Sequence, residues 1–234
     1  MPYISRMRKL IFVVLLLLPI QCFAGSLDDA LRNIEAEWAS IYYNTPKSKQ
    51  GPALVQLLDK ATGLVQQYPN AAEPIFWQAV VKATYADHQD AFSALGAIHE
   101  ARDLLVKAIK INPEVMSGSA YVTLGTLYYM VPKWPVAFGD DNAAKQMLET
   151  ALKINPDGID ANYFYGEFLM LHNKPKDAAL YFERAAAAPV RTEQPYADNQ
   201  LKAEARLALK NTQKRKISGE KGLFLSLFNS ASAN

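Results

Sequence analysis

One pattern recurs three times along the chain and restricts its fold more than any other feature. An alanine is followed by a large apolar residue four positions later, a second alanine three positions further on, and then a proline. The three copies are Ala101, Leu105, Ala108 and Pro113; Ala144, Leu148, Ala151 and Pro156; and Ala178, Phe182, Ala185 and Pro189. Residues at these spacings share one face of a helix, and proline ends a helix. We therefore expect three helices that each pack closely on a partner.

A glycine-containing helix precedes the pattern and completes a helical hairpin. In the central copy its apolar face is formed by Tyr121, Leu124, Gly125 and Tyr128. Gly166 takes the corresponding place in the next copy, and glycine lets two helices cross tightly. These features resemble the tetratricopeptide repeat (TPR), a hairpin of about 34 residues. Because such a unit cannot bury its apolar face alone, we expect an all-α solenoid of stacked hairpins with a C-terminal capping helix.

Further helices are expected on both sides of the central copy. The ranges are Leu27–Tyr43, Ala53–Tyr68, Pro74–Leu95, about Ala97–Ile111 and, as the polar cap, about Asp198–Lys216. Ser26 is the expected N-cap of the first helix. A turn is expected at Thr45–Pro52, and a connection at Asp87–Ile98. The repeat domain is thus predicted to span residues 25–216, followed by a tail at 217–234. The apolar Gly222–Phe228 in that tail suits either a strap against the solenoid or contact with a membrane surface.

The N-terminus is typical of a secretory signal peptide. Arg6, Arg8 and Lys9 precede an apolar run from Leu10 to Ile20, which is shorter than the roughly 20 residues of a membrane span. We expect cleavage after Ala24, so that residues 1–24 are removed and the protein reaches the periplasm. The alternative is a lipoprotein acylated at Cys22, although Pro19 and Gln21 suit that cleavage poorly.

Loss of residues 1–24 changes the charge and cysteine content of the protein. It removes three of the 25 basic residues and none of the 23 acidic ones, leaving a net charge of about −1. This balance gives no electrostatic case for nucleic acid binding. Because Cys22 is the only cysteine, the mature chain has no disulfide and no thiolate metal site.

The segment Val131–Asp140 is the most distinctive part of the sequence. Its two prolines cannot continue a helix, and its Trp134 and Phe138 are costly to leave in water. We expect the turn to fold onto the solenoid as a lid that packs both aromatic rings. We also expect Asp140 or Asp141 to cap the next helix.

This turn, with the helices on both sides of it, resembles the T component of TRAP transporters. Leu124-Gly125-Thr126-Leu127-Tyr128 stands before the turn, and Lys145–Pro156 follows it. The resemblance covers roughly residues 70–190, with Lys133–Asp140 as its most specific part. It implies a periplasmic, often lipid-anchored helical-repeat protein that works beside the solute-binding protein of a TRAP system. It also implies trimers around pores that could pass an apolar ligand. The cysteine-free mature chain departs from the lipid-anchored pattern.

The candidate binding residues are aromatic and lie mainly on the first helices of the hairpins, which line the concave face in this type of solenoid. They are Trp77, Tyr121, Tyr128, Tyr129, Trp134, Phe138 and Tyr165. Neighbours such as Tyr128 and Tyr129 point about 100° apart on a helix, so one of each such pair is expected to face the groove. There it could hold an extended peptide or a small apolar ligand. Glu167 faces either this groove or a polar rim.

The sequence gives no sign of catalysis, a metal site or a cofactor. His88, His99 and His172 are far apart and lack a metal-binding spacing such as HExxH. His88 and His99 flank one acidic connection, which suits an ordinary solvated loop better than a metal site. We expect a binding or assembly module rather than an enzyme. The hypothesis is an accessory protein of a TRAP-type transporter with a periplasmic solute-binding protein as partner. The alternative is a cell-envelope scaffold that binds peptides or partner proteins in its groove.

Overall fold

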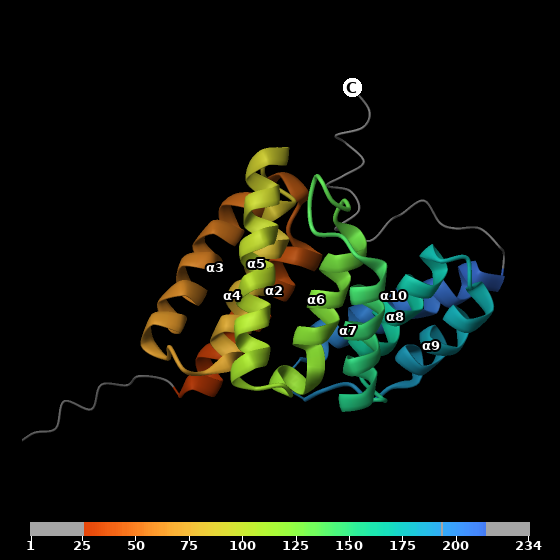
Figure 1. Ribbon diagram of the computed structural model, residues 1–234. Coiled ribbons are helices and arrows are strands. Elements are labelled where there is room, and N and C mark those ends of the chain that lie inside the picture. The colour runs from red at the N-terminus through yellow and green to blue at the C-terminus, as the bar shows by residue number, and fades with distance from the viewer. Residues whose placement is uncertain (1–25, 193, 214–234) are drawn as a thin grey trace, which may run out of the picture.

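The computed structural model describes residues 26–192 and 194–213, and every helix in this part of the chain pairs with a neighbour (Figure 1). The hairpins are α2 (Leu27–Asn44) with α3 (Lys47–Gln67), α4 (Ala72–Ala86) with α5 (Ala91–Ile111), α6 (Ser119–Met130) with α7 (Asp141–Ile154), and α8 (Ile159–Leu171) with α9 (Pro175–Ala187). A short 3₁₀ helix, η1 (Val115–Gly118), leads into α6, and α10 (Pro195–Gln213) ends the described chain. The predicted all-α stack of hairpins is confirmed.

The register predicted from the alanine pattern is confirmed. The patterned alanines and large apolar residues of α5, α7 and α9 are at most 1% exposed. A Cβ atom added at Gly125 would lie 2.9 Å from Leu148 Cγ, and one added at Gly166 would lie 2.7 Å from Phe182 Cε1. Glycine is therefore what allows each first helix to cross its partner closely.

Several helix boundaries differ from the sequence prediction. Helix α3 begins at Lys47 rather than Ala53 and includes Pro52. The side-chain amide of Gln50 donates to the carbonyls of Tyr42 (3.1 Å) and Thr45 (2.9 Å), which fastens this early turn to the end of α2. Helix α4 ends at Ala86 rather than Leu95.

The connection between α4 and α5 is correspondingly shorter than predicted. Asp90 is the N-cap of α5, and its side chain accepts hydrogen bonds from the backbone N–H groups of Phe92 and Ser93, both at 3.1 Å. This N-cap satisfies two donors that would otherwise lack a partner, and so fixes the start of the helix well before Ala97.

The predicted turn between α6 and α7 is present, and it packs only one of its two aromatic rings. Phe138 lies edge-on to His99 (ring centroids 5.0 Å apart) and Tyr128 (5.5 Å), and the Arg102 guanidinium lies 4.6 Å from its centroid. Trp134 is 85% exposed, so the prediction that it packs in the lid is wrong. Asp140, rather than Asp141, caps α7 through Asn142 N (2.8 Å) and Ala143 N (3.1 Å).

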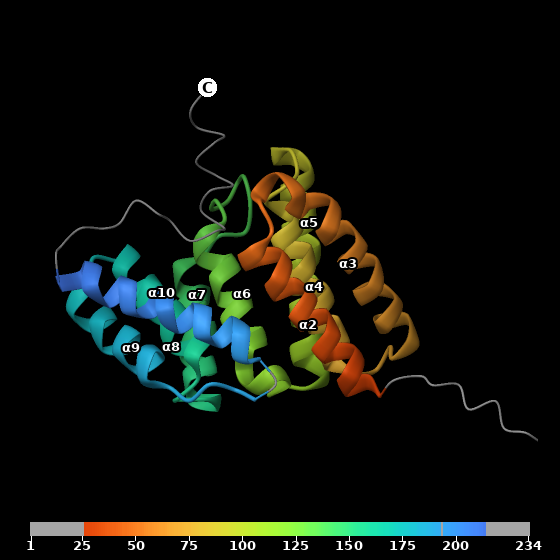
Figure 2. The ribbon, with the colours of Figure 1, turned by 180° about the vertical axis from the view of Figure 1, so that it is seen from behind.

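Helix α10 does more than cap the end of the stack. Seen from behind, it runs across α8 and α6 towards α2 (Figure 2), and it packs against α9, α8 and α2. The Tyr196 hydroxyl donates to Asn44 Oδ1 at 2.6 Å, and the Tyr196 ring lies edge-on to Tyr43. The first and last described helices therefore meet, although more than 150 residues separate the two side chains.

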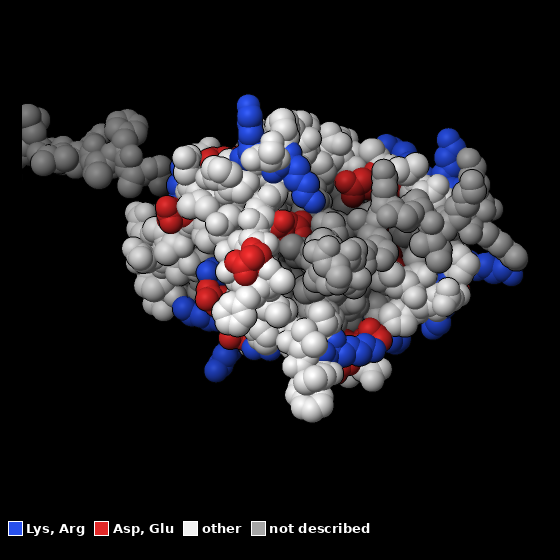
Figure 3. Space-filling view, turned by 90° about the horizontal axis from the view of Figure 1, so that it is seen from above, with Lys and Arg blue, Asp and Glu red and all other residues white. Residues whose placement is uncertain are grey.

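Charged side chains of both signs are mixed on the face of the molecule seen from above (Figure 3). This mixture follows from composition, since a chain with 25 basic and 23 acidic residues has no large excess of either charge. The described residues visible on this face form no extended patch of one sign that would attract a highly charged partner.

Two sequence predictions concern segments outside the described residues, namely the signal peptide at 1–24 and the tail at 217–234. The helix predicted to end at Lys216 begins at Pro195 and is described as far as Gln213. No helix among the described residues is both long and apolar enough to span a membrane.

A candidate ligand-binding pocket on the inner side of the stack

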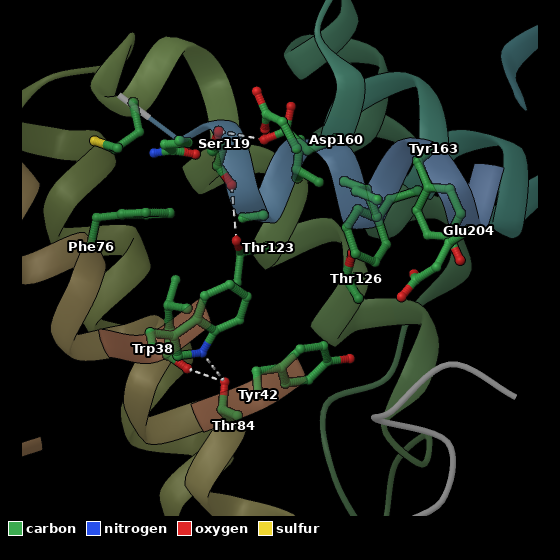
Figure 4. A pocket seen from close by; sticks show the side chains of 18 of the residues that line it. Trp38, Tyr42, Phe76, Thr84, Ser119, Thr123, Thr126, Asp160, Tyr163 and Glu204 are labelled. Atoms are coloured by element: carbon green, nitrogen blue, oxygen red, sulfur yellow. Dashed lines mark hydrogen bonds between the residues drawn. The ribbon is translucent and has the colours of Figure 1, made fainter. Parts of the chain in front are cut away.

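The helices form a partly open pocket of about 180 Å³ on the inner side of the stack. Side chains from α2, α4, η1, α6 and α8 line it, and α10 with the segment before it completes the wall. Figure 4 shows Trp38 and Tyr42 on one side of this cavity, with Tyr163 and Glu204 on the other. The contact between α10 and α2 turns the inner side of the stack into a partly open pocket.

One side of the pocket is built from aromatic rings on α2 and α4. Trp38 and Tyr42 are one helical turn apart, and their rings stack with centroids 5.2 Å apart and 14° between the planes. The centroid of the Trp77 ring lies 6.0 Å from that of Trp38, and Phe76 lies edge-on to Trp77. The Trp38 indole N–H donates to Thr84 Oγ1 at 3.0 Å, which satisfies its only donor and fixes the ring.

The opposite side carries two carboxyl groups. Glu167 of α8 accepts a hydrogen bond from the Tyr163 hydroxyl at 3.0 Å, and Glu204 of α10 lies near Tyr163, as Figure 4 shows. Burial, helped by the charge of Glu204, raises the pKa of Glu167 to about 7, although the Tyr163 hydrogen bond acts in the opposite direction. Burial likewise raises the pKa of Glu204.

A third polar group lies where α10 begins. Arg191 donates to Asp198 through Nη2 at 2.7 Å, and the carboxylate of Asp198 is 1% exposed. Burial would lower the pKa of Arg191, but the hydrogen bonds to Asp198 and the charge of Asp160 outweigh it and raise the pKa. Asp160 in turn accepts a hydrogen bond from Ser119 at the start of α6. These pairs join the entry of α10 to α6 and α8.

The structure places the seven aromatic residues predicted to bind a ligand or partner in different environments. Trp77 lines the pocket, and the other six do not. Tyr128 and Phe138 pack against each other at the turn, Tyr129 packs against Phe168, and Tyr165 donates to Glu149 at 3.1 Å. Tyr121 is partly buried and packs against the apolar core that α6, α7, α8 and α9 share. Whether any of these residues contacts a partner stays a prediction.

Several residues that line the pocket are not among the binding residues predicted from the sequence. Trp38 and Tyr42 stand at a helical spacing of four, which predicts that they share the apolar face of the first helix, and Tyr163 precedes Glu167 by the same spacing. Glu167, which the sequence left between groove and rim, lines the pocket. Glu204 carried no local signal, because its neighbours across the pocket lie on other helices.

The histidines are held by separate local contacts. His99 packs on Phe138, and His172 Nδ1 lies 2.8 Å from the carbonyl of Phe168. Burial lowers the pKa of His88. Within residues 26–192 and 194–213, no group of three or more histidine, cysteine or acidic side chains is placed to hold a metal ion.

Comparison with known proteins supports the fold. No family model matches the chain, and no curated protein matches it. Among solved structures, it is similar to TTC0263, a thermophilic TPR protein of Thermus thermophilus, with a TM-score of 0.52 at 14% identity over 88% of this chain and 99% of that one. MamA of Desulfovibrio magneticus RS-1, from residue 41 to its end, gives a TM-score of 0.43 at 14% identity over 83% of this chain and 99% of that one. The Thermus match shows a TPR-like fold for this chain.

Proposed function

We propose that the chain is an exported TPR-type binding module that holds a small ligand in its inner pocket. On this proposal it works as an accessory protein of a TRAP-type transporter, beside a periplasmic solute-binding protein, and catalyses no reaction. The observation that carries the proposal is the contact of α10 with α2 across the inner side, which leaves a partly open pocket of about 180 Å³.

The size and lining of the pocket support a small ligand over an extended peptide. An engineered protein cavity of about 150 Å³ holds a benzene molecule, so the volume here suits a ligand of similar size. The rings of Trp38, Tyr42 and Trp77 supply the apolar surface that such sites use, and a few polar groups supply orientation. A peptide strand along the inner side would have to displace α10.

The transporter role rests on the sequence. The turn Lys133–Asp140 between two TPR helices is the motif that resembles the T component, and the N-terminal segment resembles a signal peptide. The outward-facing Trp134 supports a partner surface at this turn, because it is 85% exposed and Val136 beside it is 60% exposed. Assembly into a homo-oligomer, trimeric by resemblance, belongs to the same proposal.

A cell-envelope scaffold is the second candidate, and the same exposed turn favours it. A scaffold would use Trp134 and Val136 to bind a partner protein and would need no ligand in the pocket. The two candidates therefore differ in whether the pocket is occupied.

The test is to express the full chain in a bacterial envelope, crosslink it gently and purify it without denaturant. Native mass spectrometry should then find a small molecule bound to the protein, and the crosslinked partners should include a solute-binding protein. The mass of the mature chain separates cleavage after Ala24 from acylation at Cys22. An empty pocket together with assembly factors as partners would favour the scaffold, and an empty pocket without any partner would refute both proposals.

A further inference from the structure

The lining of the pocket has an excess of negative charge. It includes four carboxyl groups, those of Asp160, Glu167, Asp198 and Glu204, and one basic group, Arg191. Arg191 is already paired with Asp198. In the described part of the chain, no ion pair involves Glu167 or Glu204. Two carboxyl groups therefore face one pocket without a basic partner among the described residues.

The carboxyl groups of Glu167 and Glu204 compete for the single proton of one hydroxyl group. Tyr163 has a single hydroxyl proton, and it donates that proton to Glu167. Glu204 lies beside the same hydroxyl but cannot receive the same proton. A buried carboxylate without a partner is costly, so this end of the pocket favours a ligand that brings positive charge or hydrogen-bond donors.

A buried hydroxyl at this end of the pocket is also incompletely bonded. Thr126 of α6 is 2% exposed and lines the pocket, and Figure 4 shows it near Tyr163 and Glu204. The hydroxyl of Tyr129 lies beside it, yet neither oxygen makes a well-formed hydrogen bond with another described residue. Native proteins rarely leave buried hydroxyls in this state, which points to a polar group of a ligand beside Thr126.

The other side of the pocket suits the same ligand. Trp38, Tyr42 and Trp77 present aromatic surface across the cavity from Glu204, as Figure 4 shows for the first two. The faces of Trp and Tyr rings attract cations, more strongly when water is excluded. The aromatic surface and the carboxyl pair therefore favour the same class of ligand.

We propose that the pocket binds a small organic cation, an ammonium group on an apolar body, with the ammonium between Glu167, Glu204 and Thr126 and the body against Trp38 and Tyr42. This inference rests on the proposed function only in requiring that the pocket holds a ligand. A neutral apolar ligand would leave the carboxyl pair without a counter-ion, and an anion would be repelled by it. A metal ion is disfavoured because the described residues offer no cluster of three metal ligands.

Calorimetric titration with three matched probes tests the ligand class. Phenethylamine, 2-phenylethanol and 3-phenylpropanoate share a phenyl ring and carry a cation, a neutral hydroxyl and an anion. At about pH 8, above the pKa of Glu167, we expect the amine to bind at least about tenfold more tightly than the alcohol, and the acid to bind most weakly. Equal binding of amine and alcohol would overturn the cation inference and leave the pocket intact. Binding of none of the three would overturn the pocket proposal itself.

Two substitutions test whether the ammonium group binds beside Glu167 and Glu204. Glu167→Gln and Glu204→Gln keep the shape of each side chain and remove its charge, so each should weaken amine binding at least about tenfold while leaving the alcohol unaffected. Glu183→Gln, on the exposed side of α9, is the matched control and should change neither affinity. Amine binding that survives both pocket variants unchanged would refute the proposed position of the ammonium. Thermal unfolding curves of all variants verify that each is folded.

Discussion

The turn between α6 and α7 offers a sharp test of the structure, because two aromatic residues four positions apart lie in opposite environments. Phe138 is half-buried and contacts His99, Tyr128 and Arg102, whereas Trp134 is 85% exposed. Removing a fully buried Phe side chain costs about 3–5 kcal/mol, so Phe138→Ala should cost roughly 2 kcal/mol. Trp134→Ala should stay within about 0.5 kcal/mol of the parent protein.

Urea unfolding followed by far-ultraviolet circular dichroism measures both variants. In thermal unfolding, a loss of about 2 kcal/mol lowers the melting temperature of a protein this size by roughly 4–8 °C. Phe138→Leu separates packing from ring chemistry: it keeps most of the apolar volume and loses the Arg102 contact, so it should cost roughly 1 kcal/mol. Equal losses for Trp134→Ala and Phe138→Ala would refute the exposed position of Trp134. No loss in Phe138→Ala would mean that the turn is not packed against α5.

Three further changes test the packing and the pocket. Gly166→Ala should lower the free energy of unfolding by roughly 1–3 kcal/mol, because the added Cβ would lie 2.7 Å from Phe182 Cε1. An unchanged midpoint in a urea titration would contradict the close crossing of α8 and α9. Glu167 has a folded pKa of about 7, above its ordinary 4.5, so the stability it contributes is full below about pH 4.5 and is lost as pH rises through 7. Between about pH 4 and 8, the unfolding free energy of Glu167→Gln should therefore rise relative to that of the parent by up to about 3 kcal/mol, measured from melting curves. The same pH dependence in both proteins would refute the raised pKa. Asp198→Ala should cost up to roughly 3 kcal/mol, because it leaves the partly buried Arg191 without its main partner, and should increase proteolysis at the start of α10. A resistant, stable variant would show that the pair does not hold α10 in place.

The repeat register could be predicted from the sequence because it depends on local spacing. Ala144, Leu148 and Ala151 lie on one face of any α-helix, and Gly125 marks where a partner crosses it. Ser26 was likewise identified as an N-cap from its neighbours, and its hydroxyl accepts from Asp29 N. The predicted helix boundaries were wrong where one side chain sets them: Gln50 holds the early first turn of α3 to the end of α2, and Asp90 caps α5 before Ala97.

The sequence by itself determined that the chain forms stacked helical hairpins, because helical periodicity and close crossings are encoded within each repeat. Only the tertiary structure decided where the pocket lies and what lines it. Glu204 meets Tyr163, and Tyr196 meets Asn44, because the chain after α9 runs back along the stack and starts α10 beside α2 (Figure 2). The packing of the turn against α5 likewise turns Phe138 inward and leaves Trp134 in water. No spacing within a single helix specifies how successive hairpins are angled, so residues on different helices could not be brought together from the sequence alone.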